Sequence, residues 1–255
     1  MIAVVFDIET GHIPQEAWTA PMMDRYKRLL AKNRKYYGDT KTNEEIKRLT
    51  VSFDPMLSFI CCITVQSVDG KKINKPKSYS CYYNGERNML QAFWADVKKM
   101  PDDVLWVSFC GKTFDIPFMT VRSLHHNVNV TNKHLLTQRS PFSHLPHFDM
   151  QSMFGRDWRL IDACALVNVP SPKNDIDGSK VAQLIKDQKL EEVVTYCEGD
   201  VLAGVKMYMK CRWSWGIFPY RGSKKKGAKN KGNWKTKGNT NQQQRRQPPP
   251  PQSEY

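Results

Sequence analysis

The feature that most constrains the fold of this chain is the apolar run at residues 2–8, which ends in carboxylic acids. The run is short and partly β-branched, a composition that favours a buried strand over a helix of the same length. Asp7 and Glu9 lie two residues apart, so in a strand both side chains leave the same face. Neighbouring carboxylates repel each other, and a hard cation such as Mg²⁺ or Mn²⁺ reverses that interaction. The pair is either a cation site or the solvated end of a strand, and other positions have to decide.

Strands and helices alternate along the rest of the chain. Charged residues with spaced apolar ones at 14–55 are typical of one or two surface helices. The remaining pattern predicts strands at 59–68, 78–83 and 104–109, helices at 88–99 and 114–125, and a long amphipathic segment at 179–213. This order indicates an α/β domain with a mixed β-sheet flanked by helices. We expect the domain to span residues 1–218.

Composition and cysteine usage limit the class of protein. With 255 residues, 40% of them apolar, the chain can bury one substantial core. It has no run approaching the roughly 20 apolar residues of a membrane span. Its seven cysteines form no Cys-x-x-Cys pair, and His144 and His147 have no cysteine nearby, which argues against structural zinc. We therefore expect a soluble protein of the reducing cytoplasm, or of the host cytoplasm if the source is viral.

Positive charge is concentrated near the C-terminal end. The formal net charge is +14, and residues 221–255 supply ten Lys or Arg against one Glu. A cationic segment with few apolar residues cannot bury enough surface to fold, so residues 219–255 are predicted to be a disordered basic, Gln- and Pro-rich tail. We expect this tail either to aid solubility only or to bind nucleic acid through Lys224, Lys225, Lys226 and Trp234. Four prolines at 248–251 are a candidate polyproline II ligand for a protein partner.

Further functional candidates lie far from the first pair in sequence. Tyr196 and Asp200 are four residues apart, so on a helix they share one face, next to the apolar stripe. Asp115 follows a Gly-containing loop at residues 110–113, where a carboxylate can cap a helix or bind a metal. Each residue alone has a commoner structural role, as a cap or a solvated side chain. Their occurrence together, in this order, points to a shared site.

Three motifs in order resemble those of the 3'-5' proofreading exonucleases. They are Phe-Asp-Ile-Glu-Thr at 6–10, Phe-Asp-Ile-Pro at 114–117 and Tyr-x-x-x-Asp at 196–200. The chain is similar to the tyrosine-bearing DEDD subclass (DnaQ-like), which has a ribonuclease H-like fold, and more narrowly to predicted 3'-5' exonucleases related to the exonuclease domain of family B DNA polymerases. The resemblance covers roughly residues 1–213, including 175–181. The histidine-bearing subclass does not fit, because this chain has Thr195 where that subclass places its histidine.

The resemblance implies a catalytic set made of Asp7, Glu9, Asp115, Tyr196 and Asp200. The four carboxylates would hold two divalent cations, Mg²⁺ or Mn²⁺, about 3.5–4 Å apart across the scissile phosphate. One cation would activate water and the other would stabilise the leaving 3'-oxyanion. The tyrosine, whose unperturbed pKa is about 10, would orient the attacking water rather than act as a base.

The same motifs imply substrate contacts at Thr10, Gly111, Lys112 and Phe114. The expected substrate is single-stranded DNA, in replication or repair. Glu198 is expected to be a solvated carboxylate outside the site.

The chain departs from the family in ways that leave alternatives open. Cys110 stands where the family usually has Asn, which removes an amide donor and acceptor. No polymerase domain is present in the sequence, so we expect the enzyme to act alone or to be recruited. A DEDD exoribonuclease acting on RNA is the main alternative, because the same carboxylates serve both sugars. A nucleic-acid-binding module that has kept the fold but lost catalysis is the other.

Overall fold

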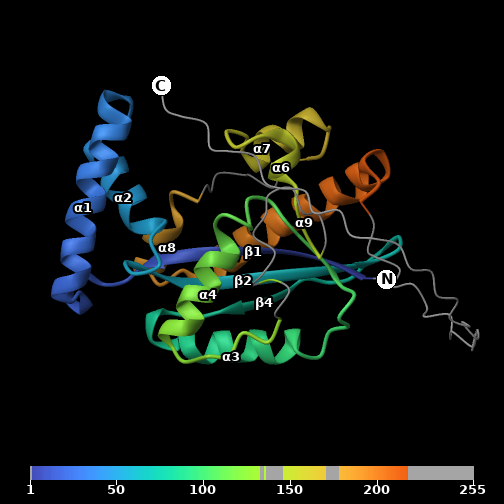
Figure 1. The fold of residues 1–255 in the computed structure, drawn as a ribbon, viewed down its shortest axis with the longest axis horizontal. Coiled ribbons are helices and arrows are strands. Elements are labelled where there is room, and N and C mark those ends of the chain that lie inside the picture. The colour runs from blue at the N-terminus through green and yellow to red at the C-terminus, as the bar shows by residue number, and fades with distance from the viewer. Residues whose placement is uncertain (1, 133–134, 136–145, 171–177, 218–255) are drawn as a thin grey trace, which may run out of the picture. The chain divides into compact units, whose positions relative to one another are not determined.

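The structure is a computed structural model that describes residues 2–132, 135, 146–170 and 178–217 (Figure 1). A mixed sheet of six strands forms its centre. The strands are β1 (Ile2–His12), β2 (Ser58–Asp69), β3 (Lys72–Ile73), β4 (Lys77–Ser80), β5 (Leu105–Ser108) and β6 (His147–Asp149). The described α-helices are α1 (Ala20–Tyr37), α2 (Asn43–Ser52), α3 (Glu86–Val97), α4 (Asp115–His125), α6 (Gln151–Phe154), α7 (Leu160–Leu166), α8 (Val181–Lys186) and α9 (Leu190–Trp215).

Strand β1 lies in the middle of the sheet, whose order is β3-β2-β1-β5-β6 with β4 also paired to β2. It runs antiparallel to β2 along its whole length and parallel to β5 over Ala3–Val5. Strand β6 continues the parallel side by pairing with β5. The predicted mixed α/β sheet flanked by helices is therefore confirmed.

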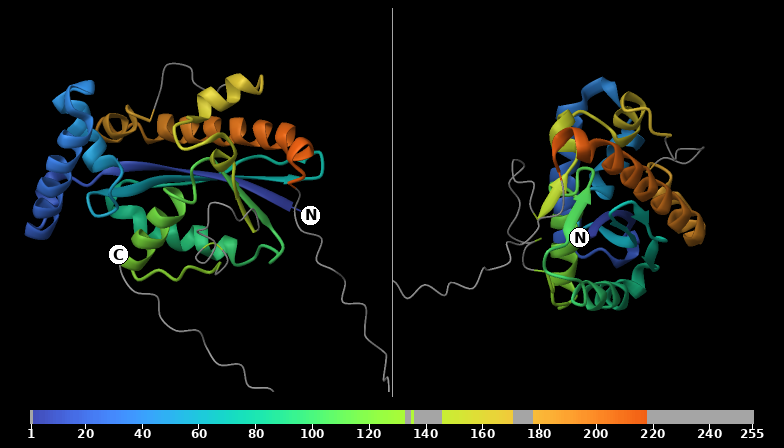
Figure 2. Two further views of the ribbon diagram at one scale, coloured as in Figure 1. Left: turned by 45° about the horizontal axis from the view of Figure 1, so that its top comes forward. Right: turned by 90° about the vertical axis from the view of Figure 1, so that its right-hand side faces the viewer.

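The alternation of side chains along β1 divides the interior into two apolar clusters. Val4, Phe6 and Ile8 face a cluster that includes residues of α3 and α4. Ala3 and Val5 face the other cluster, which is formed largely by α9, α7 and β6. Figure 2 shows α9 running along one face of the sheet while α3 and α4 cover the other. The strand is covered on both faces, which explains why it reads as an uninterrupted apolar run.

Helices α1 and α2 form a hairpin at one end of the sheet (Figure 1). Helix α2 begins with a capping box in which Thr42 and Glu45 satisfy each other's backbone amides. Helix α1 has Pro in its first turn and ends at Tyr37, followed by the C-cap residue Gly38, whose φ is 50°. None of the residues of α1 is fully buried. The hairpin is held to the body mainly through α2.

Two parts of the fold differ from the sequence-based prediction. The segment predicted to run continuously over 179–213 is divided into α8 and α9, because Gln188 between them adopts a left-handed conformation with φ 59°. The pattern did not predict β6, α6 or α7, which are short and lie between residues 147 and 166. The expected basic tail at 219–255 lies outside the described residues.

No helix within the described ranges is both long enough and apolar enough to cross a membrane. The seven cysteines, all of which lie in the described part of the chain, are free thiols.

Candidate active site

Strand β1 places the first two carboxylates on the sheet face that α9 covers. Asp7 and Glu9 have the same alternation as Ala3 and Val5, so their side chains leave the strand on that side. The β1–β2 register shifts between Glu9 and Thr10. Such an irregularity locally redirects the side chains that follow it.

Helix α4 supplies the third carboxylate at its first residue. The Asp115 side chain is only 2% exposed, and its Oδ1 accepts a hydrogen bond of 3.1 Å from the backbone amide of Ile8. That amide lies between Asp7 and Glu9 in the chain, so the bond fixes the helix terminus against the acidic part of β1. The N-cap residue of α4 is Phe114 and no side-chain capping hydrogen bond is present there, so Asp115 does not cap its own helix, which was the alternative from sequence.

The loop that precedes α4 is organised by Asp149, at the end of β6. Its carboxylate accepts hydrogen bonds from the backbone amides of Cys110 at 2.8 Å, Lys112 at 3.0 Å and Gln151 at 3.1 Å. Because β5 and β6 are parallel neighbours, the loop after β5 passes directly over the end of β6. Asp149 thus holds the loop that carries Asp115.

Helix α9 brings Tyr196, Cys197 and Asp200 against this end of β1. The Cys197 thiol lies 3.7 Å from the Asp7 carbonyl oxygen and 3.9 Å from its Oδ2. Ligand atoms of Asp7, Glu9 and Cys197 all lie within 4.8 Å of one another. The sequence-based analysis did not include Cys197, because its position in the apolar stripe of the helix indicated only packing.

The carboxylates repel one another strongly. Burial raises the pKa of Asp7 well above its usual value, and Asp115, Glu9 and Asp200 raise it further. Burial, followed by the charge of Asp149, raises the pKa of Asp115 to about 8. A bound divalent cation removes this penalty, because it favours the ionised form of each carboxylate.

The donor set fits a hard cation. Asp7, Glu9, Asp115 and Asp200 offer oxygen atoms, which Mg²⁺ and Mn²⁺ prefer. Burial raises the pKa of the Cys197 thiol well above its usual value, so the group stays protonated at neutral pH. A protonated thiol is a poor ligand for such a cation. The carboxylates are therefore the residues that would hold it.

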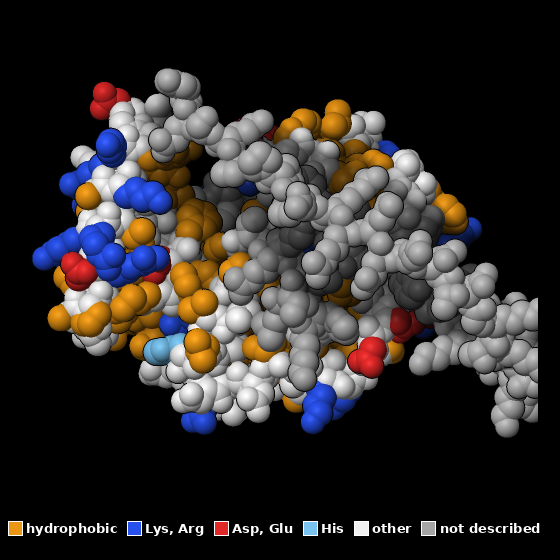
Figure 3. All heavy atoms as spheres, in the orientation of Figure 1, with side chains coloured by type: hydrophobic (Ala, Val, Ile, Leu, Met, Phe, Trp, Pro, Cys, Tyr) orange, Lys and Arg blue, Asp and Glu red, His pale blue; other side chains and the backbone are white. Residues whose placement is uncertain are grey.

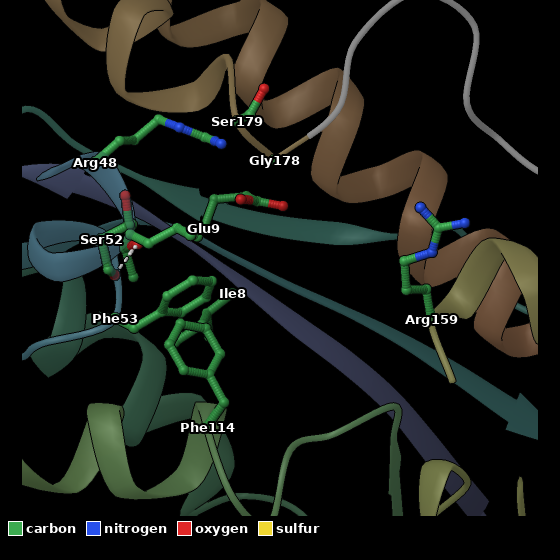
Figure 4. A pocket seen from close by; sticks show the side chains of 11 residues that line it. Ile8, Glu9, Arg48, Ser52, Phe53, Phe114, Arg159, Gly178 and Ser179 are labelled. Atoms are coloured by element: carbon green, nitrogen blue, oxygen red, sulfur yellow. Dashed lines mark hydrogen bonds between the residues drawn. The ribbon is translucent and has the colours of Figure 1, made fainter. Parts of the chain in front are cut away.

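A pocket of about 310 Å³ opens beside Glu9. Its lining comprises Ile8, Glu9, Thr10, Arg48, Leu49, Ser52, Phe53, Phe114, Arg159, Gly178 and Ser179. Figure 4 shows the Glu9 side chain between the Arg48 guanidinium and the rings of Phe53 and Phe114, with Arg159 on the far side. The pocket therefore has an acidic wall, an aromatic wall and basic groups within one space.

The residues expected to contact substrate fall into two groups. Thr10 and Phe114 line the pocket, although the Thr10 hydroxyl also donates to the Ser52 carbonyl at 3.0 Å. Gly111 and Lys112 are buried and do not line it. A Cβ on Gly111 would lie 2.4 Å from Ser108 Oγ, so this glycine is required for close packing. Lys112 is only 5% exposed, and burial lowers its pKa. A buried lysine that loses its charge more easily is poorly suited to contact a phosphate.

Glu198 is not simply solvated: it is half-buried and accepts a hydrogen bond of 2.7 Å from Ser78, on the side of β4. Lys224, Lys225, Lys226 and Trp234 lie outside the described residues.

The fold and the carboxylate cluster define an α/β protein with a site suited to divalent cations. Residues 53–244 match a family model described as a predicted 3'-5' exonuclease related to the exonuclease domain of PolB. The chain therefore belongs to this family, and the resemblance inferred from its motifs is confirmed. The matched range includes Asp115, Tyr196 and Asp200 but begins after Asp7 and Glu9.

One solved structure supports the same fold, and a second was matched more weakly. The family B DNA polymerase from the hyperthermophilic archaeon Pyrobaculum calidifontis is 17% identical, with a TM-score of 0.55 over 82% of this chain and 24% of that chain. E. coli exonuclease I in complex with a dT13 oligonucleotide is 10% identical, with a TM-score of 0.41 over 84% of this chain and 42% of that chain. The chain thus spans about a quarter of the polymerase and less than half of the exonuclease. No significant match is found among curated proteins.

Proposed function

We propose that this protein is a metal-dependent 3'-to-5' exonuclease that hydrolyses single-stranded DNA. The observation that carries the proposal is that Asp7, Glu9, Asp115, Tyr196 and Asp200 interact electrostatically with one another, although they come from β1, α4 and α9, and that Glu9 also lines the pocket. Family membership supports a nuclease. The preference for DNA over RNA rests on the relationship to the exonuclease domain of PolB.

The four carboxylates are proposed to hold two divalent cations. Bound at such a cluster, divalent cations supply a reactive water at neutral pH and neutralise charge on the leaving oxygen. The chain's own contribution is to hold the carboxylate oxygens in place. It does so through the hydrogen bond from the Ile8 amide to Asp115 and through the packing of α9 on β1. The Asp149 carboxylate in turn fixes the loop before Asp115.

Tyr196 is proposed to orient the attacking water. Burial and the neighbouring Asp200 carboxylate raise its pKa, so its hydroxyl stays protonated at neutral pH and cannot act as a general base. A Cβ on Gly178 would lie 3.8 Å from that hydroxyl, which places it next to a residue of the pocket wall. A protonated hydroxyl in this position can still hydrogen-bond to a water molecule.

The test is degradation of 5'-labelled single-stranded DNA and RNA of matched sequence, with Mg²⁺, with Mn²⁺ and with EDTA. We expect a metal-dependent ladder that shortens from the 3' end of DNA, absent in Asp7→Ala and Asp200→Asn. Tyr196→Phe should lower the rate only by roughly tenfold to a hundredfold, since it loses orientation and keeps the metal site. A ladder on RNA alone would identify an exoribonuclease instead.

Two controls make the result specific. Glu198→Gln, two residues from Asp200 on the same helix, should keep full activity because Glu198 bonds to Ser78 outside the cluster. Mg²⁺ or Mn²⁺ should raise the Tm of the wild type and of Tyr196→Phe, but not that of Asp7→Asn, since a ligand stabilises only the state that binds it. Tight binding of strands without cleavage under any metal would contradict the proposal and indicate a catalytically silent binding module.

A further inference from the structure

Helix α2 and the residue after it contribute an aromatic group to the pocket that folding alone does not explain. Phe53 is 59% exposed, although it is a large apolar side chain. Its ring meets that of Phe114 edge to face, with centroids 5.5 Å apart and an interplanar angle of 76°. An exposed aromatic ring offers a face on which a nucleic-acid base can stack.

Arg48 faces the same space from one turn earlier on α2 (Figure 4). Arg48 and Ser52 are four residues apart, so they lie on the same side of the helix. Across the pocket, Arg159 is bound to Asp162 by hydrogen bonds of 2.8 and 2.9 Å, which offset its charge. A guanidinium such as that of Arg48 matches the geometry of a phosphate group.

The whole α1–α2 region is electropositive. Residues 20–52 hold nine Lys or Arg against four Asp or Glu, whereas the remainder of residues 1–220 holds twenty of each. The Lys and Arg side chains gather over α1 and α2 on the face that Figure 3 shows. An anionic ligand is therefore favoured at this end of the molecule over a neutral or cationic one.

Hydrogen bonds and a salt bridge that involve neither the Phe53 nor the Arg48 side chain fix the hairpin in place. The backbone carbonyl of Ser52 accepts a hydrogen bond from the Thr10 hydroxyl. The Ser52 hydroxyl forms a second hydrogen bond, of 2.9 Å, with His12 Nε2. Arg25 of α1 forms a salt bridge of 2.8 Å with Asp54. These bonds hold the two pocket residues on a rigid support, which lowers the entropy cost of binding.

We infer that Phe53 and Arg48 form the subsite for the terminal nucleotide of the strand, in which the base stacks on the Phe53 ring and Arg48 contacts a phosphate. The pocket of about 310 Å³ lies at the small end of the range for ligand sites and suits one nucleotide. The identity of the ligand as a nucleic-acid strand rests on the proposed function. The placement of the base and phosphate rests on the pocket itself.

The test is binding of fluorescent single-stranded DNA in EDTA, where no hydrolysis takes place, using strands that end in a normal or an abasic 3' nucleotide. Phe53→Ala should weaken binding of the normal strand roughly 5- to 100-fold, the range of one lost base stack. It should not affect the abasic strand, which has no base to stack. Tyr36→Ala, which removes a 79% exposed ring on α1, is the matched control and should bind both strands as the wild type does.

Arg48→Gln should weaken binding of both strands equally and lower the slope of log K against log salt by about 0.7, the value for one phosphate contact of a single strand. Lys47→Gln is its control, because Lys47 is already paired with Glu44 at 2.7 Å on the exposed side of α2. Phe53→Leu keeps an apolar side chain but has no ring, so it should show the same base-dependent loss. It takes the place of Phe53→Ala if that variant proves unstable.

Failure of this inference can be told apart from failure of the proposed function. Equal losses on normal and abasic strands in both Phe53 variants would overturn the stacking role, even if the wild type degrades DNA. An Arg48→Gln slope identical to that of the wild type would overturn the phosphate contact. A base-dependent effect of Phe53 in a protein that cleaves no strand would support the subsite and reject the exonuclease.

Discussion

Cys110 has a left-handed backbone conformation, with φ 73°. Residues other than Gly, Asn and Asp rarely adopt this conformation. The conformation directs its amide to Asp149, at 2.8 Å. The related exonucleases that the motifs resemble usually have Asn here, a residue that tolerates this conformation. The conformation therefore strains Cys110, whose thiol lies 3.1 Å from the Thr113 hydroxyl in the same loop.

Replacement of Cys110 should accordingly change stability in opposite directions. We expect Cys110→Asn to raise the free energy of unfolding by roughly 0.5–1 kcal/mol and Cys110→Val to lower it by about 1–3 kcal/mol, because a β-branched residue is strained at positive φ. Urea unfolding of both variants measures this. If the Val variant were as stable as the Asn variant, backbone strain would not be the controlling factor.

His147 makes the folded protein sensitive to acid. Its ring is 1% exposed, packs against Phe6 with centroids 5.4 Å apart, and shares a 2.8 Å hydrogen bond with Ser108 Oγ. Burial, and to a lesser extent Lys112, lower its pKa from 6.5 to about 3. Between these two values the unfolded chain binds a proton that the folded protein does not, so stability falls as the pH falls.

The wild type should therefore lose about 1.4 kcal/mol of unfolding free energy per pH unit through this one group, over the lower part of that window. His147→Gln lacks the titrating ring, so its stability should fall less steeply with acid. Urea unfolding of both proteins from pH 7 to about pH 4 isolates the difference, since the other groups are shared. Parallel curves would show that His147 does not remain neutral in the folded state.

The loop between β5 and α4 shows how one buried carboxylate can position another. The Asp149 carboxylate accepts hydrogen bonds from three backbone amides and so orients the loop that leads to Asp115. Removing that acceptor leaves buried amide donors unsatisfied, which lowers stability and loosens the support of Asp115, which is proposed to bind metal at the start of α4.

We expect Asp149→Ala to lower the free energy of unfolding by about 2–4 kcal/mol and to weaken Mg²⁺-induced stabilisation. Asp24→Ala is the matched control: Asp24 forms an exposed salt bridge of 3.0 Å with Arg28, so its loss should cost no more than about 1 kcal/mol. Urea and thermal unfolding with and without Mg²⁺ provide both values. Equal effects of the two variants would mean that the loop does not depend on Asp149.

The elements that sequence predicts well are those with strong periodicity. Strand β1 and helix α9 follow from local apolar patterns, whereas the choice of Asp7, Glu9 and Asp200 as site residues depends on the order of the motifs and stays a prediction. Strand β6 is three residues long, too short for a period to show, so Asp149 at its end was missed. Arg48 and Phe53 reach the pocket only through tertiary packing of α2 on β1, which no local pattern contains.

At the scale of the whole molecule, positive charge is concentrated in two separate segments of the sequence. One is the α1–α2 region, which carries the entire excess of Lys and Arg within residues 1–220. The other is the segment 221–255, with ten Lys or Arg against one Glu. We predict different roles for them. The first lies beside the pocket and positions the end of the strand, whereas the second supplies affinity along the backbone without sequence preference.

Deletion of residues 222–255 removes nine Lys or Arg and should separate these roles. Each lost phosphate contact lowers the slope of log K against log salt by about 0.7 for single strands, so binding of a long strand should become weaker and less dependent on salt. Turnover of a short oligonucleotide that is saturating for the pocket should remain close to that of the full chain, because the carboxylates and Tyr196 are untouched. A variant with the same Lys and Arg changed to Gln distinguishes charge from length. If the full chain and both variants bind long strands with the same affinity and the same slope, the tail serves solubility, and the α1–α2 region is left as the electrostatic contact with the backbone.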